Sequence, residues 1–234
     1  MIGPQWITRK KRLRDYATAH GVAIPAGFRI SPVCGRACRE LIRRVEVRTW
    51  GVTAGTGKWD GRLNDLIAPK LNVGQRALKI ATTQLGMKEH PPGSNRGPQV
   101  DQYLAAVGLG GQSQPWCAAF VTWSFGGAGK RLTGFNCAYV PSWVDAAKAG
   151  RNGLSLVAAR DVRPGVAVCF DWQHDGTADH IGLVEIPPGA RGAGGQSSFV
   201  TIEGNTAVGN DSNGGEVMRR NRSLSEVAAF IRIN

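Results

Sequence analysis

The spacing of apolar residues changes near residue 165 from a helical period to a period of two, and this change limits the fold more than any other feature. Four segments before that point have apolar side chains at helical spacing, with glycine or proline at their ends: 74–86, 97–108, 116–126 and 140–150. Five later segments alternate and are rich in β-branched residues: 165–172, 179–186, 197–205, 215–222 and 226–234. Helices followed by strands with short links predict an α+β domain with an antiparallel sheet.

Positive charge is concentrated in the N-terminal third of the chain. The 234 residues carry a formal net charge of +12, and residues 1–74 hold 14 lysines and arginines against 5 acidic residues. Such a surface predicts an anionic partner, and charge alone leaves nucleic acid, an anionic wall polymer and acidic lipid open. The charge density falls after Pro69, where a new amphipathic pattern begins. We therefore predict a small basic helical domain over residues 1–72 and a second domain over residues 75–234.

Two features of the basic domain leave alternatives open. The stretch GTGKWDGRLNDLI at residues 55–67 resembles the end of a small three-helix peptidoglycan-binding module, and a plain helical spacer is the alternative. Cys34 and Cys38 lie four residues apart in a predicted helix, so they would share a face. We expect them to pack in the interior, with a disulfide or a metal site as the alternatives.

Cys117 differs from the other four cysteines because a proline and a tryptophan precede it at the predicted start of a helix. The backbone N–H groups of a first helical turn have no intrahelical partner, and they favour a negative charge, here the thiolate. The alternative is that Cys117 is a small buried hydrophobic side chain. A nucleophilic thiolate needs a base, and the base needs a group that orients it.

Two predicted strands supply that base and that orienting group. His180 is the first residue of one strand, where a sheet end can hold its ring rigidly, whereas His174 lies in a flexible-looking segment and is the weaker candidate. Glu203 lies on the next strand, and we expect its carboxylate to accept the Nδ1–H of His180 and fix the tautomer. Asn205 shares the face of Glu203 if the strand continues. The alternative is a structural histidine and an exposed carboxylate at a strand end.

These segments together resemble the CHAP domain, the cysteine- and histidine-dependent amidohydrolase/peptidase of the papain-like NlpC/P60 group. The resemblance rests on PWCAAFVTW at 115–123, DHIGLVE at 179–185 and TIEGNT at 201–206. It extends over roughly residues 75–234 and implies a papain-like fold with helices packed on the antiparallel sheet.

The resemblance also assigns roles to the matching residues. It implies that Cys117 is the nucleophile, His180 the base, Glu203 the orienting acid and Asn205 the polar residue that assists it. The reaction it implies is hydrolysis of amide or peptide bonds in bacterial peptidoglycan through a thioester acyl-enzyme.

The loop before Cys117 supplies the remaining site predictions. The Cys117 backbone N–H would contribute to an oxyanion hole, with a side-chain donor from Gln112 or Gln114. Gln114 and Trp116 are predicted to bind substrate. Some family members bind calcium through an aspartate-rich loop here, but residues 106–116 hold no acidic residue, so no metal and no cofactor are expected.

The bulk sequence sets expectations for partners and location. No run of 18 apolar residues predicts a membrane span, and the basic start lacks the apolar core of a secretory signal peptide. We expect a monomeric phage endolysin that leaves the host cytoplasm through a holin-made hole and acts on peptidoglycan and anionic wall polymers. The alternatives are a bacterial autolysin and an inactive wall-binding or virion-associated structural protein. A nucleic-acid binder built on RKKRLR at residues 9–14 is not expected, because no aromatic-plus-basic recognition motif accompanies that run.

Overall fold

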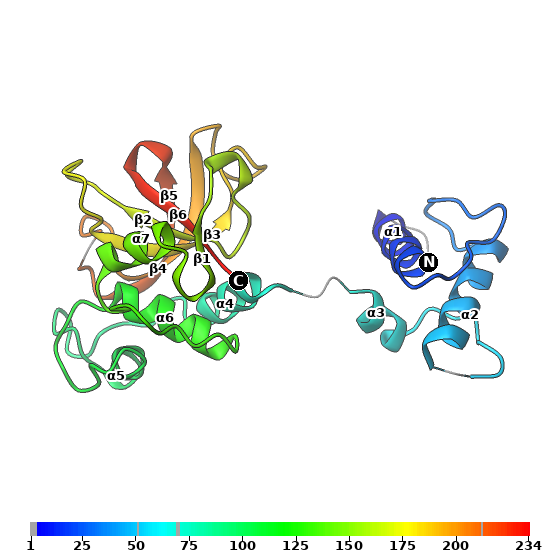
Figure 1. Ribbon diagram of the computed structural model, residues 1–234, viewed down its shortest axis with the longest axis horizontal. Coiled ribbons are helices and arrows are strands. Elements are labelled where there is room, and N and C mark those ends of the chain that lie inside the picture. The colour runs from blue at the N-terminus through cyan, green and yellow to red at the C-terminus, as the bar shows by residue number, and fades with distance from the viewer. Residues whose placement is uncertain (1–3, 51, 69–70, 212) are drawn as a thin grey trace. The chain divides into compact units, whose positions relative to one another are not determined.

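The structure, a computed structural model, describes residues 4–50, 52–68, 71–211 and 213–234 (Figure 1). It divides into two compact units, Met1–Lys70 and Leu71–Asn234. Pro69, at which the sequence indicated a boundary, lies outside the described residues. Each unit has its own hydrophobic core.

The N-terminal unit consists of three helices around one small core. These are α1 (Pro4–Ala19), α2 (Arg36–Trp50) and α3 (Gly61–Ile67). The fully buried core side chains come from all three helices: Leu13, Ala17, Leu41, Ile42, Val45 and Leu63. Asp60 begins α3 by accepting a hydrogen bond from the Leu63 N–H, which satisfies a backbone donor of the first turn.

Cys34 and Cys38 form a disulfide, so the expectation that they only pack in the interior is wrong. The reason is local: α2 begins at Arg36, so Cys34 lies before the helix and Cys38 in its first turn. Their Cα atoms are 5.3 Å apart, within the range that a disulfide spans. The bond fixes the chain where it enters α2.

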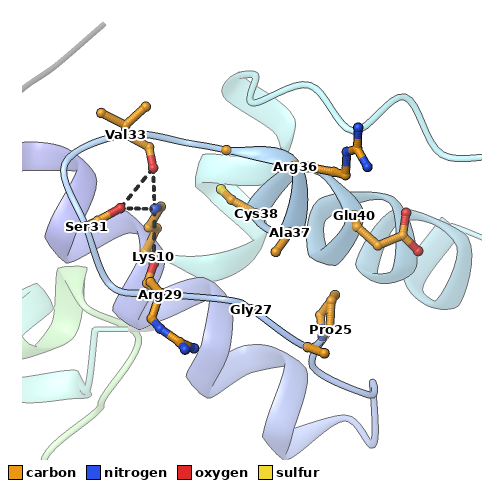
Figure 2. A pocket seen from close by; sticks show the side chains of 12 residues that line it. Lys10, Pro25, Gly27, Arg29, Ser31, Val33, Arg36, Ala37, Cys38 and Glu40 are labelled. Carbon is orange, nitrogen blue, oxygen red and sulfur yellow. Dashed lines mark hydrogen bonds between the residues drawn. The ribbon is translucent and has the colours of Figure 1, made fainter.

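A hollow of about 580 Å³ lies between α1 and the loop that leads to α2, and Cys38 is part of its lining (Figure 2). Lys10 reaches from α1 to this loop and is almost fully buried. Its Nζ donates to the Arg29 carbonyl at 3.1 Å, to Ser31 Oγ at 2.8 Å and to the Val33 carbonyl. Burial lowers the pKa of Lys10. Because all three ammonium donors are used, Lys10 fastens the loop to α1.

The second unit is built on a six-stranded antiparallel sheet. Its strands are β1 (Leu154–Leu156), β2 (Ala167–Phe170), β3 (His180–Ile186), β4 (Ser198–Thr206), β5 (Glu216–Ser223) and β6 (Val227–Ile233). They pair in the order β1-β6-β2-β3-β4-β5. The α+β prediction is confirmed, and each of the five predicted segments contains one strand. Three-residue β1 was missed because it is too short to show a period.

Helices cover one face of this sheet (Figure 1). They are α4 (Val73–Thr82), α5 (Pro98–Ala105), α6 (Cys117–Gly127) and α7 (Val140–Lys148), and short 3₁₀ turns occur at Arg151–Gly153, Ala159–Asp161 and Leu224–Glu226. α4 and α6 pack on each other and on β3 and β4, α5 packs on α6, and α7 packs on β1 and β6. A smaller apolar cluster that includes Phe170, Val184 and Phe199 lies on the opposite face.

Gly204 allows β4 to lie directly against α6. A Cβ atom at Gly204 would lie 2.8 Å from the Cβ and Cγ of Phe120 and from the Cζ3 of Trp116. Both aromatic side chains are fully buried at the start of α6. The absence of a side chain at Gly204 therefore sets how closely the N-terminus of α6 approaches the sheet.

Candidate active site

Cys117 is the first residue of α6, as the sequence predicted. Its side chain is 5% exposed, and the N-cap residue Trp116 makes no side-chain capping hydrogen bond. The first-turn N–H groups therefore have no side-chain cap, and they favour negative charge at this end of the helix. The other two free cysteines, Cys137 and Cys169, are also buried, but neither lies at a helix start.

His180 is the first residue of β3 and is fully buried. The ring of Trp172 stacks on the imidazole, with centroids 5.2 Å apart. Cys117 lies close enough to this ring to raise the pKa of His180. The other three histidines of the chain, His20, His90 and His174, are exposed. The structure thus singles out the histidine that the sequence favoured.

Glu203 lies on β4, adjacent to β3, and its side chain is fully buried beside His180. Its Oε2 is 3.2 Å from the Nε2 atom of His180. We expected the Nδ1–H to face the carboxylate, and this was wrong: the ring presents Nε2 to Glu203, and Nδ1 is buried without a hydrogen-bond partner among the described residues. Gly182 makes room for the pair, because a Cβ there would lie 2.6 Å from the Cγ of Glu203.

Arg222 is the charged partner of Glu203 that the sequence did not reveal. This β5 side chain is 3% exposed, and it donates from Nε to Oε1 at 2.9 Å and from Nη2 to Oε2 at 2.6 Å. Thr201 Oγ1 donates to the same Oε1. Both carboxylate oxygens of Glu203 are therefore engaged, and Oε2 is shared between Arg222 and His180.

Burial and charged partners act in opposite directions on the two ionisable side chains. Burial lowers the pKa of His180, but the negative charge of Cys117, its hydrogen bond and the contact with Glu203 outweigh it and raise the pKa to about 9. Burial raises the pKa of Glu203, but hydrogen bonds from Arg222 and His180 outweigh it and hold the pKa at about 2. At neutral pH the site therefore contains an imidazolium beside an ionised carboxylate.

The remaining predicted residues occupy different surroundings. Asn205 is fully buried and has a positive φ of 59°. Its Oδ1 accepts from Gly215 N, and its Nδ2 donates to Asn213 Oδ1. Those contacts tie the β4–β5 loop to β4, and no hydrogen bond to His180 or Glu203 joins them among the described residues. Gln114 is exposed on the loop before α6, and its role stays a prediction.

Trp116 does not fit the prediction that it binds substrate. It is completely buried, its ring stacks on Tyr103 with centroids 5.4 Å apart, and its Nε1 donates to Glu89 Oε1 at 2.9 Å. A bulky aromatic side chain next to a nucleophile can either line the groove or anchor the helix. Here it anchors the start of α6 in the core.

Comparison with known families identifies the domain that holds this arrangement. Residues 109–205 match the model of the CHAP domain family. The chain contains a CHAP domain. The match includes Cys117, His180, Glu203 and Asn205, and a search of curated proteins gave no match. A CHAP domain implies a hydrolase of the amidase or peptidase type that acts on peptidoglycan.

Among the described residues, no group of three or more histidine, cysteine, aspartate or glutamate side chains is arranged to hold a metal ion. In the same part of the chain, the helices are too short or too polar to cross a bilayer.

The raised pKa of His180 predicts the alkaline limit of CHAP activity. The imidazolium persists above the ordinary histidine pKa of 6.5 and is lost as the pH rises through about 9. We therefore expect kcat/KM for cell-wall hydrolysis to hold through neutral pH and to fall around pH 9. His174→Asn is the matched control, because His174 is exposed and asparagine tolerates its positive φ of 56°. If kcat/KM fell near pH 6.5 in both the wild type and His174→Asn, Cys117 and Glu203 would not act on His180.

Proposed function

We propose that this protein is a peptidoglycan hydrolase of the phage endolysin type that cuts an amide or peptide bond with Cys117 as nucleophile. The observation that supports the proposal most is the cluster itself: a cysteine at a helix N-terminus beside a buried histidine, which in turn contacts a buried, ionised carboxylate. An inactive wall-binding protein would have no need to bury these three groups together.

The proposed reaction is acyl transfer in two steps. His180 Nδ1 holds the proton of Cys117, and the thiolate attacks the carbonyl carbon of a wall peptide. The backbone N–H of Cys117 stabilises the oxyanion. The C–N bond then breaks, and the imidazolium gives its proton to the leaving amine, which leaves a thioester on Cys117. A water molecule that gives its proton to His180 attacks the thioester carbonyl carbon, the C–S bond breaks, and the carboxylic acid and the Cys117 sulfur are released beside the imidazolium.

Glu203 keeps its charge throughout this reaction. Its contact with Nε2 fixes the ring and leaves Nδ1 as the nitrogen that exchanges the proton in the proposed reaction, and its negative charge stabilises the imidazolium before and after the attack. No proton needs to pass to Glu203 in either step.

Digestion of purified cell walls tests the proposed reaction and identifies the bond. Mass spectrometry of the soluble fragments should find new amino and carboxyl ends, either at the lactyl group of the glycan or within the peptide. Fragments that carry only new reducing sugar ends would show a glycosidase and overturn the proposal. Intact walls after exposure to the folded enzyme would overturn it as well.

We further propose that the basic N-terminal unit binds anionic wall polymers. Its excess of lysine and arginine favours such a partner, and its resemblance to a peptidoglycan-binding module agrees with this. Sedimentation of the full-length Cys117→Ala protein with walls should decrease as salt increases, since salt screens the attraction. Binding that is unaffected by salt would contradict an electrostatic role.

The endolysin assignment includes a location in the host cytoplasm and release through a holin. Bacterial cells that express the protein should stay intact until their inner membrane is permeabilised, and should then lyse. Lysis of intact expressing cells would favour the autolysin alternative.

A further inference from the structure

We propose that Arg222 is a positioning residue of this active site, which keeps Glu203 ionised and turned toward His180. The inference rests on the proposed cysteine chemistry, and it adds a member to the site at a position outside the matched residues 109–205. Three observations carry it: the geometry of the pair, its burial, and the charges that surround it.

Arg222 and Glu203 form a bidentate pair. Arg222 contacts both oxygens of Glu203 through two different nitrogens, Nε and Nη2. A planar guanidinium that binds a carboxylate in this way fixes its plane as well as its position. Because Oε2 also faces His180 Nε2 at 3.2 Å, the plane of the Glu203 carboxylate sets the orientation of the imidazole beside Cys117.

Because Glu203 is buried, its carboxylate needs the positive charge of Arg222 to stay ionised. Glu203 is fully buried, and burial of a carboxylate favours its neutral form. Arg222 is itself shielded, because Phe170 and Trp172 each lie 5.2 Å from its guanidinium carbon. Trp172 also stacks on His180, so one aromatic ring covers both cationic partners of the carboxylate.

The surrounding charges balance within the cluster. Around Glu203 stand His180 from β3 and Arg222 from β5, and Cys117 of α6 faces His180. Asp211, in the loop between β4 and β5, pairs with the outer side of Arg222 at 3.0 Å and also binds Arg220. Without Arg222, one imidazolium would have to serve both Glu203 and the thiolate. The carboxylate would then take up a proton and cease to stabilise the imidazolium.

The test compares Arg222→Gln with Arg222→Lys and with a matched arginine. Arg219 is the control, because it lies on the same strand but binds Glu185 at the surface and is 50% exposed. We expect Arg222→Gln to lower kcat about 10- to 100-fold, the usual effect of losing a group behind a reacting residue, with KM nearly unchanged. Lysine keeps the positive charge but cannot bind both oxygens of Glu203 through two nitrogens, so Arg222→Lys should recover part of the loss in kcat. Arg219→Gln should behave as wild type.

The pH profile separates positioning from a role in stability alone. If Glu203 loses its charge in Arg222→Gln, the pH at which kcat/KM falls on the alkaline side should move from about 9 to a lower value. If Glu203 stays ionised, loss of a nearby positive charge moves this pH upward. An unmoved or raised value, or a loss of activity fully explained by unfolded protein, would overturn the proposal.

A double-mutant cycle tests whether Arg222 acts through Glu203. The Glu203→Gln and Arg222→Gln double variant should be no slower than the slower single variant, because both remove the same function. If the fold-losses in kcat of the two single variants multiplied in the double variant, Arg222 would act independently of Glu203, and the inference would be overturned.

Alkylation of Cys117 provides a readout that needs no substrate. A weakened imidazolium activates Cys117 less, so iodoacetamide should modify Cys117 of Arg222→Gln about tenfold more slowly at pH 6 than in wild type. The modified site is identified by peptide mass spectrometry. Equal rates would contradict the role of Arg222. A slow variant in a protein that leaves peptidoglycan intact would support the positioning role and refute only the proposed substrate.

Discussion

Replacing Cys117 with alanine should reduce cell-wall hydrolysis to background, a loss on the order of 10⁴-fold or more, as expected when the nucleophile of a catalytic unit is removed. The reason is that the thioester has no other atom on which to form. Cys117 is the first residue of α6 and contributes one small, almost buried side chain, so its truncation removes little packing. The variant should therefore melt within a few degrees of wild type. Turbidity loss of a wall suspension measures the activity.

Cys169→Ala provides the matched control for this variant. Cys169 lies on β2 and is completely buried, and burial raises the pKa of its thiol, which disfavours the reactive thiolate. We expect this variant to lose some stability but to keep its turnover per folded molecule. If Cys117→Ala cleared walls as fast as wild type, the assignment of the nucleophile would be wrong.

The fold of the second unit could be predicted because its periods are clear. The later segments alternate and are rich in β-branched residues, and glycine or proline separates the helices before them. The candidate site could be predicted in part for the same reason. A helix start places Cys117, and strand starts and strand faces place His180 and Glu203.

Arg222 could not be predicted because its role depends on register. The sequence of β5 contains three arginines, and only the pairing of β4 with β5 shows which one reaches Glu203. Arg222 lies opposite Phe199 and extends along the sheet to a carboxylate four residues further on. A period of two gives the face of each arginine but not its partner across the strands.

The other differences have equally local causes. The orientation of the His180 ring depends on the position of the Glu203 carboxylate across the β3–β4 pair, which no spacing specifies. The burial of Trp116 depends on Glu89 and Tyr103, both distant in sequence. The disulfide depends on whether α2 begins before or after Cys34, and element boundaries are the least certain part of a pattern.

Introducing a methyl group at Gly204 should disturb both the stability and the chemistry of the CHAP domain. The Cβ of Gly204→Ala would lie 2.8 Å from Phe120 and Trp116, two buried side chains that cannot move into solvent. We expect the free energy of unfolding in urea to fall by about 1–3 kcal/mol. α6 should also move away from β4 and shift Cys117 relative to His180. Turnover of the folded fraction should then fall as well, since a displacement of about 1 Å can cost 10²-fold in rate.

Gly126→Ala is the control, because it adds the same methyl group to α6 itself at an exposed position where a Cβ would meet no atom within 4 Å. Alanine favours a helix over glycine by about 1 kcal/mol, so this variant should be slightly more stable and fully active. A lower stability for Gly204→Ala and a higher stability for Gly126→Ala would show that the contact between β4 and α6 is the part that does not tolerate an added methyl group. Gly204→Ala could instead match wild type in its free energy of unfolding and in its turnover rate. The close approach of β4 to α6 would then not set the distance between the thiol and the imidazole.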